Sequence, residues 1–230
     1  MSQKSVLIPA ICVLLAVTMA ISGCRNSTPP GGNLIADLTE TIKKNRAADY
    51  YIAGLNYADK GEYDKAITEY TKAIELDPED FMIYYFRGNA YAEKGECDKA
   101  IADYNKAIEL DPEHSCVYLA RGLTYRSKGE YDKAIADHTK VIDLGGGWVG
   151  YYERGRDYED KGDYDKAIAD LTKVIRAGHD FAKAYYYRGC AYKSKGDYDN
   201  AANDFEKVLP IADDPKLFED ARQALKEMGK

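Results

Sequence analysis

The chain has 230 residues, of which 45% are hydrophobic and 31% are charged, a composition typical of a folded globular protein. Its formal net charge of −7 argues against the clustered lysines and arginines of a nucleic-acid-binding surface, and against electrostatic docking on anionic lipid. Tyrosine is the unusual residue, with 21 copies against one tryptophan and five phenylalanines. Because of the negative net charge, we expect no nucleic-acid partner.

Residues 1–23 have the pattern of a signal peptide. Lys4 supplies a positive charge, and Val6 to Ile21 form an apolar run broken by one proline and one threonine. The segment Ile21-Ser22-Gly23-Cys24, at the end of this run, resembles the lipobox of bacterial lipoproteins. In that family the chain is cut before the cysteine, and its sulfur carries a diacylglycerol. The resemblance implies that Cys24 is lipidated and that the protein is anchored to a bacterial envelope membrane.

Two alternatives remain for this segment. It could be an ordinary secretory signal that is cut after Ser22, or an uncleaved anchor, although the apolar run is shorter than the roughly 20 residues of a membrane span. Residues 24–33 include Pro29-Pro30-Gly31-Gly32 and predict a flexible tether of at most about 30 Å. Arg25 follows the cysteine, in place of the aspartate that retains some lipoproteins inside, which favours the outer membrane over the inner membrane.

A short pattern, Lys-Gly-(Glu/Asp)-x-Asp-x-Ala, fills most of the remaining chain in five copies. A tyrosine recurs at the same steps of 33 or 34 residues, at Tyr50, Tyr84, Tyr118, Tyr151 and Tyr185. A fixed period of this length predicts stacked repeats, in which no single unit buries its apolar face alone. The glycines of the pattern are Gly61, Gly95, Gly129, Gly162 and Gly196.

Each copy predicts two antiparallel helices. In the second copy, Tyr84, Gly88 and Tyr91 recur at helical spacing before Gly95 ends the first helix. The second helix ends at Asp111-Pro112, because proline disfavours helix in the residue before it. Its apolar stripe consists of Ala100, Ile101, Tyr104, Ala107 and Ile108. Glycines such as Gly88 recur seven residues before each turn glycine, which predicts a close approach of the paired helices.

This pattern resembles the tetratricopeptide repeat over residues 47–215. The resemblance implies an all-α fold, a right-handed superhelix of five helix-turn-helix repeats with a capping helix. The Asp-Pro stop is replaced by Gly145-Gly146 and by Gly178-His179, and His138 replaces the equivalent of Tyr104. Residues 34–46 predict a flanking helix that echoes the second helix of a repeat. The predicted repeats are 47–80, 81–114, 115–147, 148–181 and 182–215, and the capping helix is 216–230.

In tetratricopeptide proteins the first helices line a concave groove that binds a partner. The resemblance implies an apolar, aromatic groove in the N-terminal repeats and additional cations in the C-terminal repeats. A protein or peptide with apolar anchors and an acidic stretch would suit such a groove. The residues that bind chaperone tails in some relatives are absent. The predicted groove residues are Tyr51, Leu55, Tyr85, Phe86, Asn89, Leu119, Leu123, Arg126, Tyr152, Arg156, Lys183, Tyr186, Tyr187 and Lys193.

Arginine precedes the first-helix glycine in four repeats, where the family usually has an apolar residue. We hypothesise that each pairs with an acid of the preceding repeat, as Arg121 would with Asp103, and that Arg222 of the capping helix is the last of this row. The alternative is that the arginines bind an anion. The four arginines are Arg87, Arg121, Arg154 and Arg188.

The sequence contains no phosphate-binding, metalloprotease or hydrolase motif, and its three histidines lack metal-ligand spacing. We therefore expect no catalytic residue, cofactor or metal. Cys97 and Cys116 should begin helices about 20 Å apart, too far for a disulfide, and Cys190 is either a reactive thiol or a packing residue.

The sequence thus predicts a non-enzymatic scaffold for protein partners. The alternative is a glycan- or small-ligand-binding lipoprotein that uses groove tyrosines, and the oligomeric state is left open.

Overall fold

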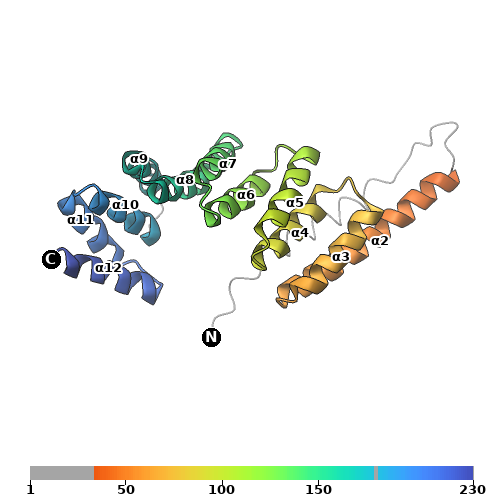
Figure 1. Ribbon diagram of the computed structural model, residues 1–230, viewed down its shortest axis with the longest axis horizontal. Coiled ribbons are helices and arrows are strands. Elements are labelled where there is room, and N and C mark those ends of the chain that lie inside the picture. The colour runs from red at the N-terminus through yellow and green to blue at the C-terminus, as the bar shows by residue number, and fades with distance from the viewer. Residues whose placement is uncertain (1–33, 179–180, 230) are drawn as a thin grey trace. The chain divides into compact units, whose positions relative to one another are not determined.

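The computed structural model describes residues 34–178 and 181–229, and all regular elements in these ranges are α-helices (Figure 1). The all-α prediction is therefore confirmed. The predicted signal peptide 1–23, Cys24 and the tether 24–33 lie outside the described residues. The helices are α2 (Leu34–Asp59), α3 (Tyr63–Leu76), α4 (Phe81–Glu93), α5 (Cys97–Leu110), α6 (Ser115–Ser127), α7 (Tyr131–Asp143), α8 (Gly147–Lys161), α9 (Tyr164–Arg176), α10 (Ala182–Ser194), α11 (Tyr198–Val208) and α12 (Pro215–Glu227).

The chain divides into two compact units, residues 1–42 and 43–230. The repeats lie in the second unit. α2 runs without a break from Leu34 to Asp59, so the flanking helix expected at 34–46 is the first part of α2 and not a separate second helix. No glycine or proline stands between Leu34 and Ala53, and the helix therefore has no signal to end there.

A glycine with a left-handed backbone ends the first helix of each repeat. In repeat 2, Gly95 has φ of +77°, and the backbone N–H of Glu96 donates to the Tyr91 carbonyl at 2.9 Å. This hydrogen bond satisfies a carbonyl at the end of α4, and its geometry requires the positive φ that glycine adopts without strain. The turn motif of the sequence is thus a helix stop, after which the chain reverses into α5.

The paired helices of a repeat approach closely at a glycine, as predicted. A Cβ added to Gly88 of α4 would lie 2.7 Å from the Tyr104 ring of α5, so any larger residue would collide with that ring. The other repeats have the same arrangement with different residues from the second helix. The pairs are Gly54 with Tyr70, Gly122 with His138, Gly155 with Leu171, and Gly189 with Phe205.

Consecutive repeats pack through the residue that precedes the repeat tyrosine. Ile83 of α4, Val117 of α6 and Ala184 of α10 are each buried in an apolar cluster with residues of the preceding second helix. Burying aliphatic side chains in this way stabilises a stack by roughly 1.5–3 kcal/mol for each large residue. The second unit is thus built from contacts between neighbouring repeats.

α12 begins at Pro215, one residue before the predicted capping range 216–230, and is amphipathic. Leu217, Ala221 and Leu225 are buried against α11, while Arg222 and Lys226 are exposed. A polar outer face at the last helix avoids leaving an apolar repeat surface open to water.

Candidate functional site

The first part of the predicted groove is an aromatic cluster on α2 and α4. The ring centroids of Tyr51 and Phe86 lie 5.6 Å apart, and those of Phe86 and Tyr85 lie 5.1 Å apart, both in edge-to-face geometry. All three side chains are half-buried. Burial raises the pKa of the Tyr51 and Tyr85 hydroxyls, so both stay neutral at physiological pH. The cluster therefore offers rigid apolar surface with polar edges.

The ring beneath this cluster has an unsatisfied hydroxyl. In repeat 2 the Tyr104 hydroxyl donates to Asn89 Oδ1 at 2.8 Å. In repeat 1 the equivalent of Asn89 is Leu55, which cannot accept, and the fully buried Tyr70 hydroxyl has no hydrogen-bond partner within the described residues. The two repeats thus share an aromatic ring but differ in whether its polar atom is paired.

The C-terminal part of the predicted groove is a second aromatic cluster, on α8 and α10. The Tyr186 and Tyr187 ring centroids are 5.5 Å apart, and the Arg156 guanidinium lies 4.7 Å from the Tyr187 centroid. Tyr152 is only 6% exposed and packs on Phe181 at 4.8 Å, so it belongs to the core and offers a partner little surface.

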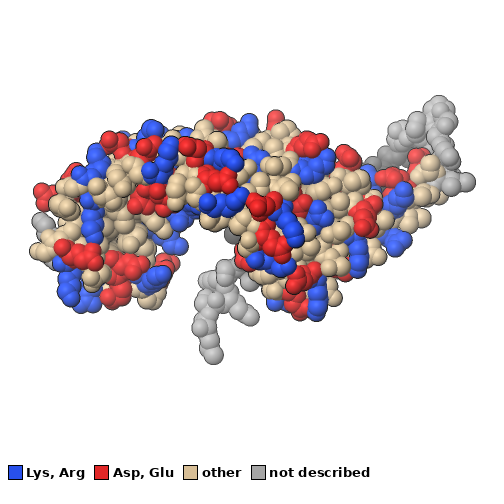
Figure 2. Space-filling view, viewed as in Figure 1, with Lys and Arg blue, Asp and Glu red and all other residues tan. Residues whose placement is uncertain are grey.

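Most of the predicted groove cations already have partners within the chain. Lys193 forms an ion pair with Glu227 of α12 at 2.7 Å, and Arg126 is bound by carboxylates of α8. Lys183 is exposed. Figure 2 shows positive and negative side chains interspersed over the visible face. An acidic partner stretch therefore has fewer free cations to contact than the sequence indicates.

Repeat 3 separates the two aromatic clusters. Leu119 is half-buried and Leu123 is 37% exposed, and neither position carries a ring. The structure therefore places the predicted groove residues in two aromatic clusters with an aliphatic and charged segment between them.

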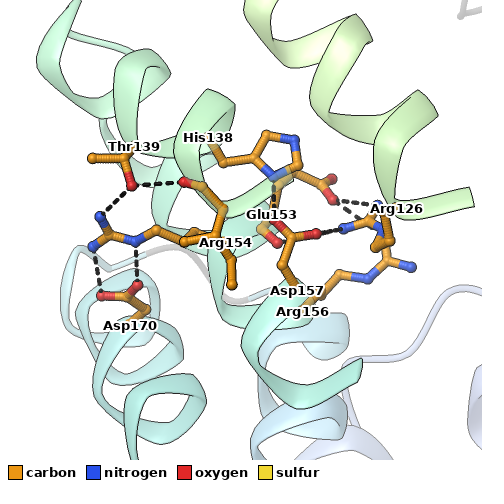
Figure 3. Close-up of polar contacts among 9 residues, drawn as sticks. Arg126, His138, Thr139, Glu153, Arg154, Arg156, Asp157 and Asp170 are labelled. Carbon is orange, nitrogen blue, oxygen red and sulfur yellow. Dashed lines mark hydrogen bonds and ion pairs between the residues drawn. The ribbon is translucent and has the colours of Figure 1, made fainter. Parts of the chain in front are cut away.

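A cluster of polar side chains connects repeats 3 and 4 at this segment (Figure 3). His138 Nδ1 of α7 donates to Asp157 Oδ2 of α8 at 2.5 Å, and both side chains are fully buried. Arg126 of α6 donates to Asp157 Oδ1 at 3.2 Å and forms an ion pair with Glu153 Oε2 at 2.7 Å. His138 Nε2 faces Gly122 and has no hydrogen-bond partner in the described part of the chain. We call His138, Asp157, Arg126 and Glu153 the interface cluster.

Sequence reasoning identified only parts of the interface cluster. His138 was recognised as a replacement at a packing position, and Arg126 as a groove residue. Asp157 was missed, although it stands where repeats 2 and 5 have Ala90 and Ala191. A carboxylate at a buried small-residue position needs a partner, and this was the available signal.

The predicted pairing of the arginine row is wrong. Arg87 forms two hydrogen bonds of 2.8 Å with Asp103, which belongs to the same repeat, and does not pair with an acid of the preceding repeat. The other pairs are Arg121 with Asp137, Arg154 with Asp170, and Arg188 with Asp204. The third nitrogen, Nη1, donates to a side chain of the preceding second helix, which for Arg87 is Thr71 at 3.1 Å.

The register of the paired helices explains this correction. Gly88 faces Tyr104, and the residues immediately before them, Arg87 and Asp103, face each other in the same way. The acid therefore lies opposite the arginine of its own repeat. Each arginine is satisfied within the chain and only 15–18% exposed, so the row is a structural element and not a free anion site.

The arginine–aspartate pair is absent at both ends of the row. Repeat 1 has Ala53 at the arginine position, and Glu69 pairs with Lys72 of its own helix at 2.7 Å. Arg222 was expected to extend the row, but it is exposed and pairs weakly with Glu219 of α12 at 3.6 Å. No second helix follows α12 in the described chain to supply an aspartate.

The remaining sequence expectations concern thiols, metals and membrane spans. Cys97, Cys116 and Cys190 are free, and burial raises the pKa of the Cys190 thiol to about 12, so it is a protonated packing residue. The described residues contain no group of side chains able to hold a metal ion. Within the same ranges, no helix combines the length and apolar character of a membrane span.

Comparison with known families places repeats over most of the second unit. Residues 54–95 and 88–125 match the family described as TPR repeat, and residues 117–144 and 152–216 match families described as tetratricopeptide repeat. No curated protein sequence matches the chain.

Solved structures show the same fold. The crystal structure of a MamA protein is 30% identical with a TM-score of 0.67, and the match covers 72% of this chain and 91% of that one. YrrB, described as a TPR protein with an unusual peptide-binding site, is 21% identical with a TM-score of 0.66, covering 84% and 98% of the two chains. A thermophilic TPR protein from Thermus thermophilus is 22% identical with a TM-score of 0.60, covering 78% and 99%.

Proposed function

The chain belongs to the tetratricopeptide repeat family, and on this premise we propose that it is a non-enzymatic scaffold that binds a protein or peptide through its first-helix surface. The observation that carries the proposal is the pair of aromatic clusters, Tyr51 with Tyr85 and Phe86, and Tyr186 with Tyr187. These rings are held by neighbouring rings yet remain partly exposed. Ordered aromatic surface gives large contact area at low entropic cost. YrrB, of the same fold, is described as having a peptide-binding site, which supports a peptide partner here.

Site-specific photo-cross-linking tests the proposed surface in cells. A photoreactive amino acid at Tyr85 or Tyr186 should give one defined cross-linked protein. Tyr198 is a matched control, because it is 55% exposed but lies on the second helix α11. Equal capture of the same species from Tyr198, or no capture from either groove position, would contradict the proposal.

A glycan ligand has less support from the geometry. Stacking a sugar requires an open ring face, and the Tyr187 face is covered by the Arg156 guanidinium at 4.7 Å. The rings also contact one another edge to face, as Tyr85 and Phe86 do. Retention of the purified protein on cell-wall glycan, lost on Tyr187→Ala, would reverse this preference.

We also propose that a lipid on Cys24 anchors the scaffold to the bacterial envelope, with the outer membrane favoured. The support is the lipobox resemblance of Ile21 to Cys24 and the residue that follows, Arg25. Metabolic labelling with a fatty acid should mark the chain and should be lost in Cys24→Ala. Fractionation of the labelled membranes by density then distinguishes the two membranes. A labelled Cys24→Ala protein would exclude Cys24 as the lipidated residue, and an unlabelled unaltered chain would exclude lipidation.

A further inference from the structure

The interface between repeats 3 and 4 is filled differently from its neighbours. Repeats 2, 3 and 5 bury Ile83, Val117 and Ala184 in apolar clusters with the preceding second helix. Repeat 4 has Gly150 at this place, and a Cβ there would lie 2.6 Å from Ile142 Cγ1 of α7. α7 and α8 therefore approach closely at Gly150, but this position of α8 contributes no side chain to the contact.

The interface cluster adds buried polar contacts beside this close approach of α7 and α8. His138 and Asp157 are 0% exposed, and Arg126 binds Asp157 from the other side. Apolar packing loses stability gradually as contacts loosen, whereas removal of one member of a buried ion-pair network leaves its partner charged and unpaired. The interface therefore favours two conditions, fully paired or opened to water, over a loosened intermediate.

The connection across this interface lacks the Asp-Pro stop, as the connection after repeat 4 does, and it has three consecutive glycines. Repeats 1 and 2 end at Asp77-Pro78 and Asp111-Pro112, and proline restricts the chain there. Between α7 and α8 the chain has three glycines at 145–147, of which Gly145 has φ of +86°. Glycine gains more backbone freedom than any other residue when its contacts are lost. The connection is held by backbone hydrogen bonds, such as that from the Gly146 N–H to the Val141 carbonyl at 2.8 Å, and becomes free to move once they open.

We propose that the interface cluster is a polar latch at a hinge, which joins repeats 1–3 and repeats 4–5 into one structure and lets them separate as two cooperative segments when it opens. The hinge is residues 145–147. This goes beyond the proposed scaffold function, because it concerns a motion of the fold that does not depend on any partner. Tyr85 and Tyr186, one in each aromatic cluster, lie in different segments. The latch therefore sets the position of the two clusters relative to each other.

Hydrogen exchange of the full chain, measured peptide by peptide, tests the proposal. Protection should fall into two groups that differ by about tenfold or more, with the step at 145–147. Asp157→Ala should raise exchange in α7 and α8 by about tenfold while changing α4 and α5 by less than about twofold. Arg87→Ala is the matched control: it breaks a buried pair inside repeat 2, and should raise exchange in α4 and α5 without enlarging the step. Uniform protection from α4 to α11, or a step at another interface, would overturn the hinge. Equal loosening of all repeats by Asp157→Ala would overturn the latch.

A measurement on the unaltered chain keeps the proposal testable if the variant does not fold. Trp148 is the single tryptophan and stands in the first turn of α8, next to the hinge. Denaturant unfolding followed by Trp148 fluorescence should not coincide with unfolding followed by helical circular dichroism, because the two segments unfold separately. Superimposable transitions would show that no hinge divides the chain.

Discussion

The repeat 2–3 and repeat 3–4 interfaces use equivalent helices with opposite contents. In the first, Val117 of α6 is fully buried in a cluster with Tyr104 and Ala107 of α5. In the second, Gly150 of α8 contributes no side chain, and the buried contact is the His138–Asp157 pair at 2.5 Å. The same backbone arrangement therefore accepts either an apolar or an ionic filling.

The polar contacts between repeats 3 and 4 require several residue changes together. His138 alone would bury an unpaired nitrogen, and Asp157 alone would bury an unpaired carboxylate. Arg126 supplies the second donor that Asp157 requires, and Glu153 balances the charge of Arg126. The residues of the interface cluster thus depend on one another, because each one pairs a polar atom or charge that another member would otherwise leave buried and unpaired.

Removal of Asp157, the central acid of the interface cluster, should lower stability more than any other change proposed here. Asp157→Ala leaves Arg126 partly unpaired and His138 without its acceptor, so the free energy of unfolding should fall by about 3–5 kcal/mol in urea denaturation. Thr124→Ala is the control, because Thr124 is the equivalent buried residue of repeat 3, carries no charge and donates to the Ala120 carbonyl. That change should cost about 1 kcal/mol. Equal costs at the two positions would mean that the interface cluster is no stronger than an ordinary hydrogen bond.

The next effect tests the corrected pairing inside the repeats. A double-mutant cycle of Arg87→Ala and Asp103→Ala should give a coupling energy of about 2 kcal/mol, because the two side chains share two hydrogen bonds. The same cycle for Arg121 and Asp103, the pair first expected from the sequence, should give less than about 0.5 kcal/mol. Chemical denaturation of the single and double variants measures both couplings. A larger coupling for the second pair would restore the original hypothesis.

The repeat period made the helices and turns predictable, because each signal is local. Gly95 ends α4 through its own backbone conformation. Gly88, which has no side chain, indicates that another helix packs closely against it. The partner of Arg87 was not predictable from spacing alone, since Glu69 of the preceding repeat and Asp103 of the same repeat hold equivalent positions on their second helices. Only the register of Gly88 against Tyr104 selects Asp103.

The candidate site was predictable in kind but not in detail. First-helix tyrosines such as Tyr85 and Tyr186 do form aromatic clusters, as helical spacing indicates. Tyr152 has the same spacing but is buried, because Phe181, the residue just before α10, covers it. The sequence indicates that Lys193 is a free cation, but in the structure it forms an ion pair with Glu227, which lies on another helix. Contacts between distant segments decide both cases.

A smaller and opposite pair of effects should appear at two buried tyrosines. Tyr104→Phe removes the hydrogen bond to Asn89 and should lower stability by about 1 kcal/mol. Tyr70→Phe removes a buried hydroxyl that has no partner in the described residues, so stability should stay equal or rise by up to about 1 kcal/mol. Thermal denaturation of both variants compares the signs. A loss at Tyr70 as large as that at Tyr104 would show that a water or another group satisfies the Tyr70 hydroxyl.

The smallest effect compares two carboxylates of α8, one inside the interface cluster and one outside it. Burial raises the pKa of Glu159, and Asp160 beside it acts in the same direction. A raised pKa means that the folded state disfavours the charged form, so this penalty is absent below about pH 4 and is complete above the folded-state pKa. Glu159→Gln should therefore raise Tm by about 1–2 °C at pH 7, and the gain should disappear in acid. Glu153→Gln should lower Tm at pH 7 instead, because Glu153 is bound by Arg126 at 2.7 Å. If both variants shift Tm in the same direction, pairing within the interface cluster does not distinguish these two acids.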